Sequence, residues 1–183
     1  MRNNAIGLIE VSSIAAGIQA ADAMLKAAAV ELVLSRSICS GKYMVLVRGV
    51  VADVDAAVLA GGAAGRGFLI DAFVIPDVHE AVFPALYGSN PVDRLDALGI
   101  LESFSVASLI EAADAAVKAA AVRLIEIRLA MALGGKAFVT LTGPVASVQA
   151  AVDAGAEVLG GKGLLVNKVV IPAPRRELLD EMV

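Results

Sequence analysis

The chain has 183 residues, of which 58% are hydrophobic and only 4% aromatic, so its core is aliphatic and few side chains can stack on bases. Its formal net charge of −4 argues against a nucleic-acid-binding protein, which normally carries a basic stripe. No uncharged run reaches the ~20 apolar residues of a membrane-spanning helix, and one cysteine excludes an internal disulfide. We therefore expect a cytoplasmic protein without nucleic-acid or membrane partners.

Strands and helices are predicted to alternate through the first half of the chain. Apolar runs with strand character lie at 5–11, 30–38, 43–47 and 68–75. A helix is predicted at 14–28, where Ser12 and Ser13 can cap the first turn, followed by helices at 53–64 and 79–86. This order, β-α-β-β-α-β-α, predicts an α+β fold of the ferredoxin-like type, in which helices cover one face of an antiparallel sheet.

The second half of the chain repeats the first. Residues 6–10 (Ile-Gly-Leu-Ile-Glu) reappear 92 positions later as Leu-Gly-Ile-Leu-Glu, and the helix segment 21–28 reappears at the same offset. Gly41-Lys42 recurs after 94 positions, and the Val-Ile-Pro at 74–76 recurs after 96. Such growth of the offset is expected when insertions fall in loops. We predict two tandem domains, 1–90 and 91–183, joined by a turn-rich linker.

The motifs of the first copy, most of which recur in the second in the same or a similar form, resemble those of a known family. In order, they are Gly-Leu-Ile-Glu at 7–10, Ala-Asp-x-x-x-Lys-Ala at 21–27, Gly-Lys at 41–42, Arg-Gly at 48–49 and Val-Ile-Pro at 74–76. This pattern resembles the bacterial microcompartment shell (BMC) domain, and its duplication resembles the tandem-domain shell proteins. The resemblance implies a structural protein of the microcompartment shell rather than an enzyme. It further implies a homotrimer whose six domains mimic a hexamer around a central pore, tiling with other shell proteins.

Two lysines occupy matching positions in the repeated helix. Taken alone, Lys26 and Lys118 would be solvated residues near a helix end, but the resemblance implies that they line the edges at which shell discs meet. The chain departs from many single-domain relatives directly after each Val-Ile-Pro, where Asp77 and Ala173 replace a basic residue. An altered edge contact is therefore expected.

The only cysteine lies in a predicted hairpin. By resemblance, the hairpin faces the central pore, and the corresponding loop of the second copy places Leu133 opposite Cys39. The pore-lining residues that the resemblance implies are Ser37, Ile38, Ser40, Gly41, Leu133, Gly134 and Gly135. The two loops therefore differ at the position expected to line the pore.

One thiol per chain cannot hold a metal, but a three-fold axis would bring three thiols together. Thiolates select iron–sulfur clusters, Zn or Cu(I), whereas a solitary cysteine in most proteins is a small buried hydrophobe. The Cys39-x-Gly-Lys hairpin resembles the propanediol-utilisation type of tandem shell protein, which implies a [4Fe–4S] cluster held by Cys39 of three chains. Such a plug would conduct electrons to encapsulated redox enzymes. The alternatives are an open metabolite pore with an inert cysteine, and a trimeric regulatory module that binds a small ligand.

No other residues form a convincing catalytic site. His79 is the only histidine and is interpreted as a helix N-terminal or interface residue. Asp53 and Asp55 fall where a helix begins, which suits the helix dipole. Gly61, Gly62 and the glycines after them follow a helix rather than a strand, so they do not form a phosphate-binding loop.

Overall fold

The computed structural model divides into two compact units, Met1–Val78 and His79–Val183, which are described separately. The residues described are 4–88, 90, 92, 95–129, 134–175, 177 and 178. The domain boundary expected from the repeat, at residues 90 and 91, lies later than this division. The physical reason is the packing of α3 (Val82–Leu86), which contacts strand β6 and helix α4 of the second unit.

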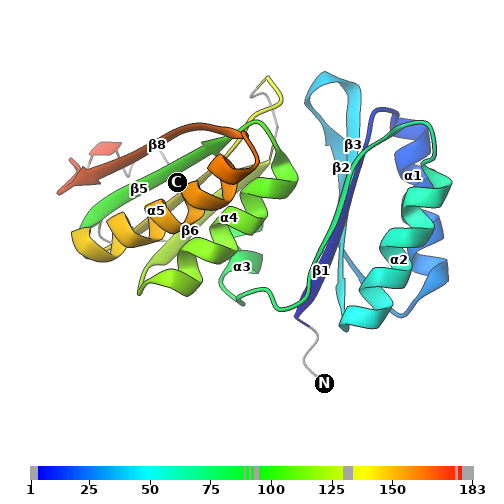
Figure 1. The fold of residues 1–183 in the computed structure, drawn as a ribbon, viewed down its shortest axis with the longest axis horizontal. Helices are drawn as coiled ribbons and strands as arrows, with labels where there is room; N and C mark the ends of the chain where they lie inside the picture. The colour runs from blue at the N-terminus through cyan, green and yellow to red at the C-terminus, as the bar shows by residue number, and fades with distance from the viewer. Residues whose placement is uncertain are drawn as a thin grey trace. The chain divides into compact units, whose positions relative to one another are not determined.

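The first unit contains one four-stranded sheet. Its strands are β1 (Ala5–Val11), β2 (Glu31–Ile38), β3 (Lys42–Gly49) and β4 (Leu69–Ile75). They lie in the order β2-β3-β1-β4, and every neighbouring pair is antiparallel. Helices α1 (Ile14–Ala27) and α2 (Val51–Ala64) lie side by side on one face (Figure 1).

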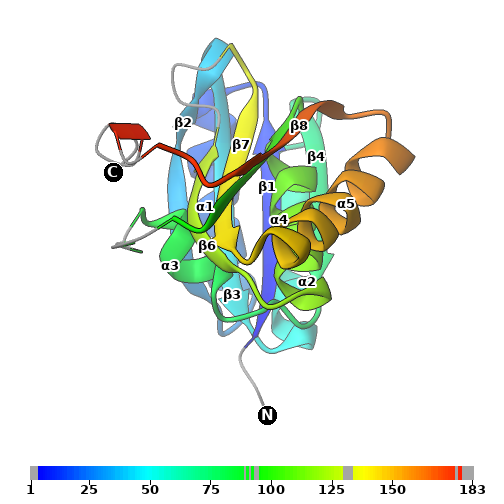
Figure 2. The ribbon, with the colours of Figure 1, turned by 90° about the vertical axis from the view of Figure 1, so that its left-hand side faces the viewer.

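The second unit repeats this arrangement. Its strands are β5 (Ala97–Ser103), β6 (Arg123–Leu129), β7 (Ala137–Gly143) and β8 (Leu165–Pro172). They lie in the equivalent order β6-β7-β5-β8, again antiparallel throughout. Helices α4 (Val106–Ala119) and α5 (Val145–Gly161) pack against each other and against this sheet (Figure 2). The prediction of two tandem ferredoxin-like domains is confirmed.

The first helix of each unit begins at a serine cap. The Ser13 Oγ accepts a hydrogen bond from the Ala16 N–H (3.3 Å), and the Ser105 Oγ accepts one from the Ser108 N–H (3.2 Å). Each cap satisfies one of the unpaired N–H groups of the first turn, a contribution of about 1 kcal/mol. The second helix of the first unit begins at Val51 rather than at residue 53, after an N-cap without a side-chain hydrogen bond.

Close packing of neighbouring elements explains two glycines of the first unit. A Cβ at Gly7 would lie only 2.4 Å from the Val58 Cγ2, and one at Gly61 would lie 2.6 Å from the Met24 Cγ. Gly7 therefore lets α2 pack on β1, and Gly61 lets α1 pack on α2. This assigns Gly61 to packing, in keeping with the rejection of a phosphate-binding loop. Among the described helices, none is long and apolar enough to cross a membrane.

Candidate functional site

The hairpin between β2 and β3 holds the cysteine at its tip. Ile38 pairs with Lys42 across the two strands, and a short 3₁₀ turn, η1 (Cys39–Gly41), joins them. Gly41 has a φ of +72°, a left-handed conformation that glycine adopts at little cost. Cys39 is half-buried, Ser37 is exposed and Ile38 is buried. The hairpin therefore holds one thiol at the end of the β2–β3 ladder.

Within one chain, Cys39 does not belong to a complete metal site. No group of three or more histidine, cysteine or acidic side chains in the described part of the chain could hold a metal ion. A half-buried thiol at a hairpin tip can still serve as one ligand of a site built from several chains. The donor chemistry thus fits a cluster shared between subunits and does not fit one held by a single subunit.

The corresponding loop of the second unit differs from the cysteine hairpin. Gly134 and Gly135 both have left-handed φ values, +61° and +88°, and lead into β7. Leu133, expected opposite Cys39, lies outside the described residues. The chain has no second cysteine, so this loop cannot supply a thiol. The two units of one chain therefore carry two different loops at this position.

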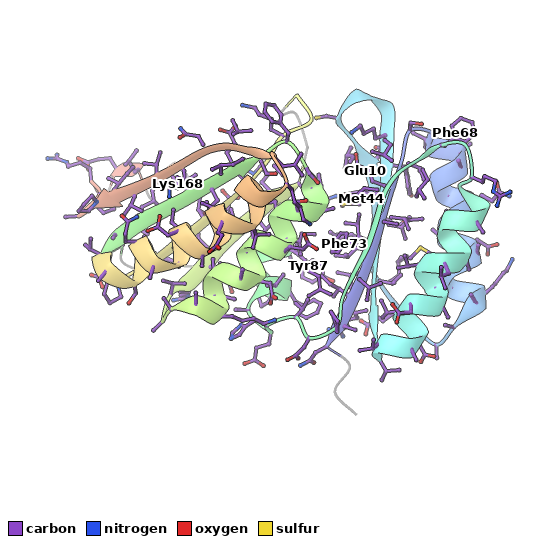
Figure 3. All side chains as sticks on the ribbon, viewed as in Figure 1. Glu10, Met44, Phe68, Phe73, Tyr87 and Lys168 are labelled. Atoms are coloured by element: carbon purple, nitrogen blue, oxygen red, sulfur yellow. The ribbon has the colours of Figure 1, made fainter. Side chains whose placement is uncertain are left out.

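An ion pair between a buried glutamate and a partly exposed lysine supports the base of the cysteine hairpin. The Lys42 Nζ lies 2.7 Å from the Glu10 Oε1, and Glu10 is only 4% exposed. Glu10 pairs with Met44 across β1 and β3, and both side chains lie on the sheet face opposite α1 and α2 (Figure 3). Because Glu10 offsets its charge, Lys42 is a structural anchor of the hairpin rather than an uncommitted positive charge.

The same pair recurs in the second unit, where the Lys136 Nζ lies 2.5 Å from the Glu102 Oε1. Sequence analysis found both motifs, Gly-Leu-Ile-Glu and Gly-Lys, but did not join them. The signal was present in the sequence, since the glutamate and the lysine are both retained in the two copies.

Arg36 adds positive charge near the hairpin. It pairs with Met44 across β2 and β3, so Arg36, Met44 and Glu10 form a row on one face of the sheet. The Arg36 Nε is buried and has no hydrogen-bond partner among the described residues. The row continues to Asp71, which pairs with Glu10 across β1 and β4. With Lys42 also on this face, its positive and negative charges balance, and Arg36 is a cation whose Nε is not bound by any described residue.

The two lysines expected at disc edges are exposed at the ends of their helices. The Lys26 Nζ contacts the Asp22 Oδ2 at 2.6 Å, and the Lys118 Nζ contacts the Asp114 Oδ2 at the same distance. Each pair spans one helical turn, and Lys26 is the more exposed of the two lysines. Both ammonium groups are therefore accessible from outside, and their role in tiling stays a prediction.

His79 has a structural role at the start of the α3 segment. Its backbone N–H donates to the Asp114 Oδ1 (2.7 Å), and its Nδ1 accepts from the Ala81 N–H (3.2 Å). Asp53 lies in the first turn of α2, as the dipole argument predicts. His79 therefore lies just before a helix, and Asp53 lies in the first turn of one.

A pocket of about 220 Å³ lies between α5 and β8, lined by Gln149, Val152, Lys168, Val169 and Val170. The Lys168 Nζ (labelled in Figure 3) binds the Asp153 Oδ1 at 2.6 Å, and the Gln149 Nε2 binds the other oxygen. Hydrogen bonds from Lys168 and then Gln149 lower the pKa of the Asp153 carboxyl. The polar groups at this pocket thus bind one another, which disfavours it as the effector site of a regulatory module.

Known proteins share both the sequence and the fold. The BMC domain family matches residues 5–78 and 97–174. The bacterial microcompartment shell protein PduT of Citrobacter freundii is 43% identical over 99% of this chain and 98% of its own length. The carboxysome assembly protein CcmO of Synechococcus elongatus is 31% identical over 97% of this chain and 68% of its length. A crystal structure of a microcompartment protein from Desulfitobacterium hafniense superposes with a TM-score of 0.91 and 52% identity, covering 95% of this chain and 97% of that one.

Proposed function

Because the chain belongs to the BMC-domain family of microcompartment shell proteins, we propose that three copies form a trimer whose central pore holds a [4Fe–4S] cluster through Cys39. The shell role itself follows from family membership, since the similar proteins named above are shell and carboxysome proteins. The trimer, the pore and the cluster go beyond that role. The observation that carries them is the half-buried thiol at the tip of one of two divergent hairpins.

The number of thiols favours a site shared by three chains. Two domains per chain give six hairpins in a trimer, but only three of them contain a cysteine. A [4Fe–4S] cluster takes one protein or solvent ligand per iron, so three thiolates leave one iron for water or a small molecule. The chain's own contribution is to fix the thiol: the β2–β3 ladder sets the direction of the tip, and the Glu10–Lys42 pair anchors its base.

Charge near the hairpin supports the same proposal. A thiolate-ligated cluster is anionic, and Arg36, on β2 three residues before Cys39, supplies a positive charge whose Nε has no hydrogen-bond partner among the described residues. When bound, the cluster supplies one-electron redox chemistry. In this proposal the cluster lies between the lumen and the cytosol and exchanges electrons with enclosed redox enzymes. The cluster also closes the pore to metabolites.

The direct test is the Cys39→Ser variant, purified without oxygen beside the wild type. We expect the wild type to contain iron and sulfide and to absorb in the visible, whereas Cys39→Ser is colourless because a hydroxyl is a poor ligand for iron. Trimer formation, measured by light scattering, should be unchanged. Ser37→Ala is the matched control, since Ser37 is exposed on the same hairpin but has no thiol.

Equal iron content in the wild type and in Cys39→Ser would disprove the cluster. A wild-type trimer without iron after anaerobic reconstitution would instead support the alternative of an open metabolite pore. A wild-type monomer would contradict the trimer as well as the pore.

A further inference from the structure

The repeated Asp–Lys pair has an additional partner in only one of its two copies. In the second unit, the Asp114 carboxylate binds Lys118 with one oxygen and accepts the His79 backbone N–H with the other, at 2.7 Å. Asp114 is almost completely buried. In the first unit, Asp22 binds Lys26 in the same geometry but is 61% exposed, and Lys26 is its only partner among the described residues.

The internal repeat identifies the residue whose backbone N–H corresponds to the second hydrogen-bond donor that Asp22 lacks among the described residues. His79 lies three residues after the Pro76 of the first Val-Ile-Pro, and Arg175 lies three residues after the Pro172 of the second. Within the described residues, no acceptor for the Arg175 backbone N–H is found. Two residues before Arg175, the Ala173 N–H donates a hydrogen bond to the Asp96 O, which fixes the start of this segment on the second unit.

The apolar surface shows the same difference between the copies. In the second unit, α3 packs on β6 and α4, and both Ile110 of α4 and Leu124 of β6 are fully buried. Their counterparts in the first unit, Ile18 of α1 and Leu32 of β2, are 57% and 41% exposed. Exposed aliphatic side chains that flank an open hydrogen-bond acceptor are characteristic of an interface.

We propose that the segment after Pro172 of one chain binds the α1–β2 face of a second chain, with the Arg175 N–H donating to Asp22. This inference rests on the proposed trimer and assigns its contact. The segment that follows the first copy lies on the second copy, whereas no contact equivalent to His79–Asp114 is found among the described residues for the segment that follows the second copy. Each chain therefore has one donor segment and one acceptor face, a head-to-tail arrangement that repeats until a ring closes.

The first experiment is disulfide trapping in a Cys39→Ser background. The pair Asp22→Cys and Arg175→Cys should cross-link between chains and give dimer and trimer bands on a non-reducing gel. The pair Asp114→Cys and His79→Cys is the positive control, since it should close within one chain. Leu59→Cys with Arg175→Cys is the negative control, because Leu59 is 75% exposed on α2, away from α1 and β2.

The second experiment changes the apolar face. Ile18→Glu places a carboxylate at the position where the second copy buries Ile110. We expect the trimer to dissociate into monomers, as measured by light scattering. Leu59→Glu is the matched control, because its repeat counterpart is the exposed Asp153, and it should remain trimeric. A wild-type trimer that neither cross-links at 22 and 175 nor responds to Ile18→Glu would overturn this contact while leaving the proposed function intact. A monomeric wild type would overturn both.

Discussion

At the scale of single residues, the Glu10–Lys42 pair explains how the cysteine hairpin keeps its direction. Its two members lie 32 positions apart in the chain, and Glu10 is nearly completely buried. A buried carboxylate without a partner is costly, so the lysine is held at the base of the hairpin. The second unit repeats the pair with a more exposed glutamate. The two hairpins therefore share an anchor although their tips differ.

Replacing Lys42 by methionine keeps the aliphatic stem but leaves the Glu10 carboxylate unpaired. We expect the variant to lose about 1–3 kcal/mol of unfolding free energy, the cost of an unsatisfied buried acceptor. Urea unfolding at fixed protein concentration measures this loss. Lys26→Met is the control, because the Lys26–Asp22 pair is exposed at both ends and should contribute almost nothing. Equal stability of the two variants would contradict the anchor.

At the scale of elements, α2 packs so closely on β1 that there is no room for a methyl group on Gly7. Gly7→Ala would bring a Cβ within 2.4 Å of the Val58 Cγ2 and 2.7 Å of the Val54 Cγ1, and we expect a loss of about 1–3 kcal/mol from overpacking. Gly62→Ala, whose new Cβ would lie 3.7 Å from the nearest atom, should instead gain about 0.5–1 kcal/mol in helix propensity. The difference between their thermal midpoints tests the fit, and an unchanged midpoint for Gly7→Ala would refute it.

The sequence alone predicted the elements but not all of their contacts. Aliphatic periodicity and the repeat predicted the strands, the helices and the ferredoxin-like order, and Ser13 caps α1 as expected. The Glu10–Lys42 pair depends on the register of β1 and β3, which periodicity does not fix. The packing of α3 was also missed, because a five-residue helix is too short for its apolar pattern to show which sheet it covers. The proposed cluster at Cys39 involves neighbouring chains, which no single sequence positions.

At the scale of the whole molecule, shell assembly needs two kinds of contact. The proposed Asp22–Arg175 contact joins chains into a trimer, whereas Lys26 and Lys118 are expected to join trimers into a sheet. The two roles use different atoms, because Lys26 contacts the Oδ2 of Asp22 and the proposed contact uses the other carboxylate oxygen, as His79 does at Asp114. Loss of one kind of contact should therefore leave the other in place.

The variant Lys26→Ala with Lys118→Ala tests this separation. We expect electron microscopy to show loss of extended sheets, while light scattering still reports the trimer. Lys162→Ala is the control, since Lys162 is a partly exposed lysine that binds Glu111 and is outside the repeated helix motif. Sheets that persist in the double variant would rule out these lysines as edge residues.

The anchored hairpins also have a consequence for protein engineering. The Glu–Lys pair is the same in both copies, but the tip is Cys39 in one loop and glycine-rich in the other. The base of the loop is therefore the constant part, and the tip is an exchangeable module. In the proposed trimer, a designed histidine at position 39, with Glu10 and Lys42 retained, would present three imidazoles to one axis and replace the proposed thiolate ring by a ligand set for a different metal.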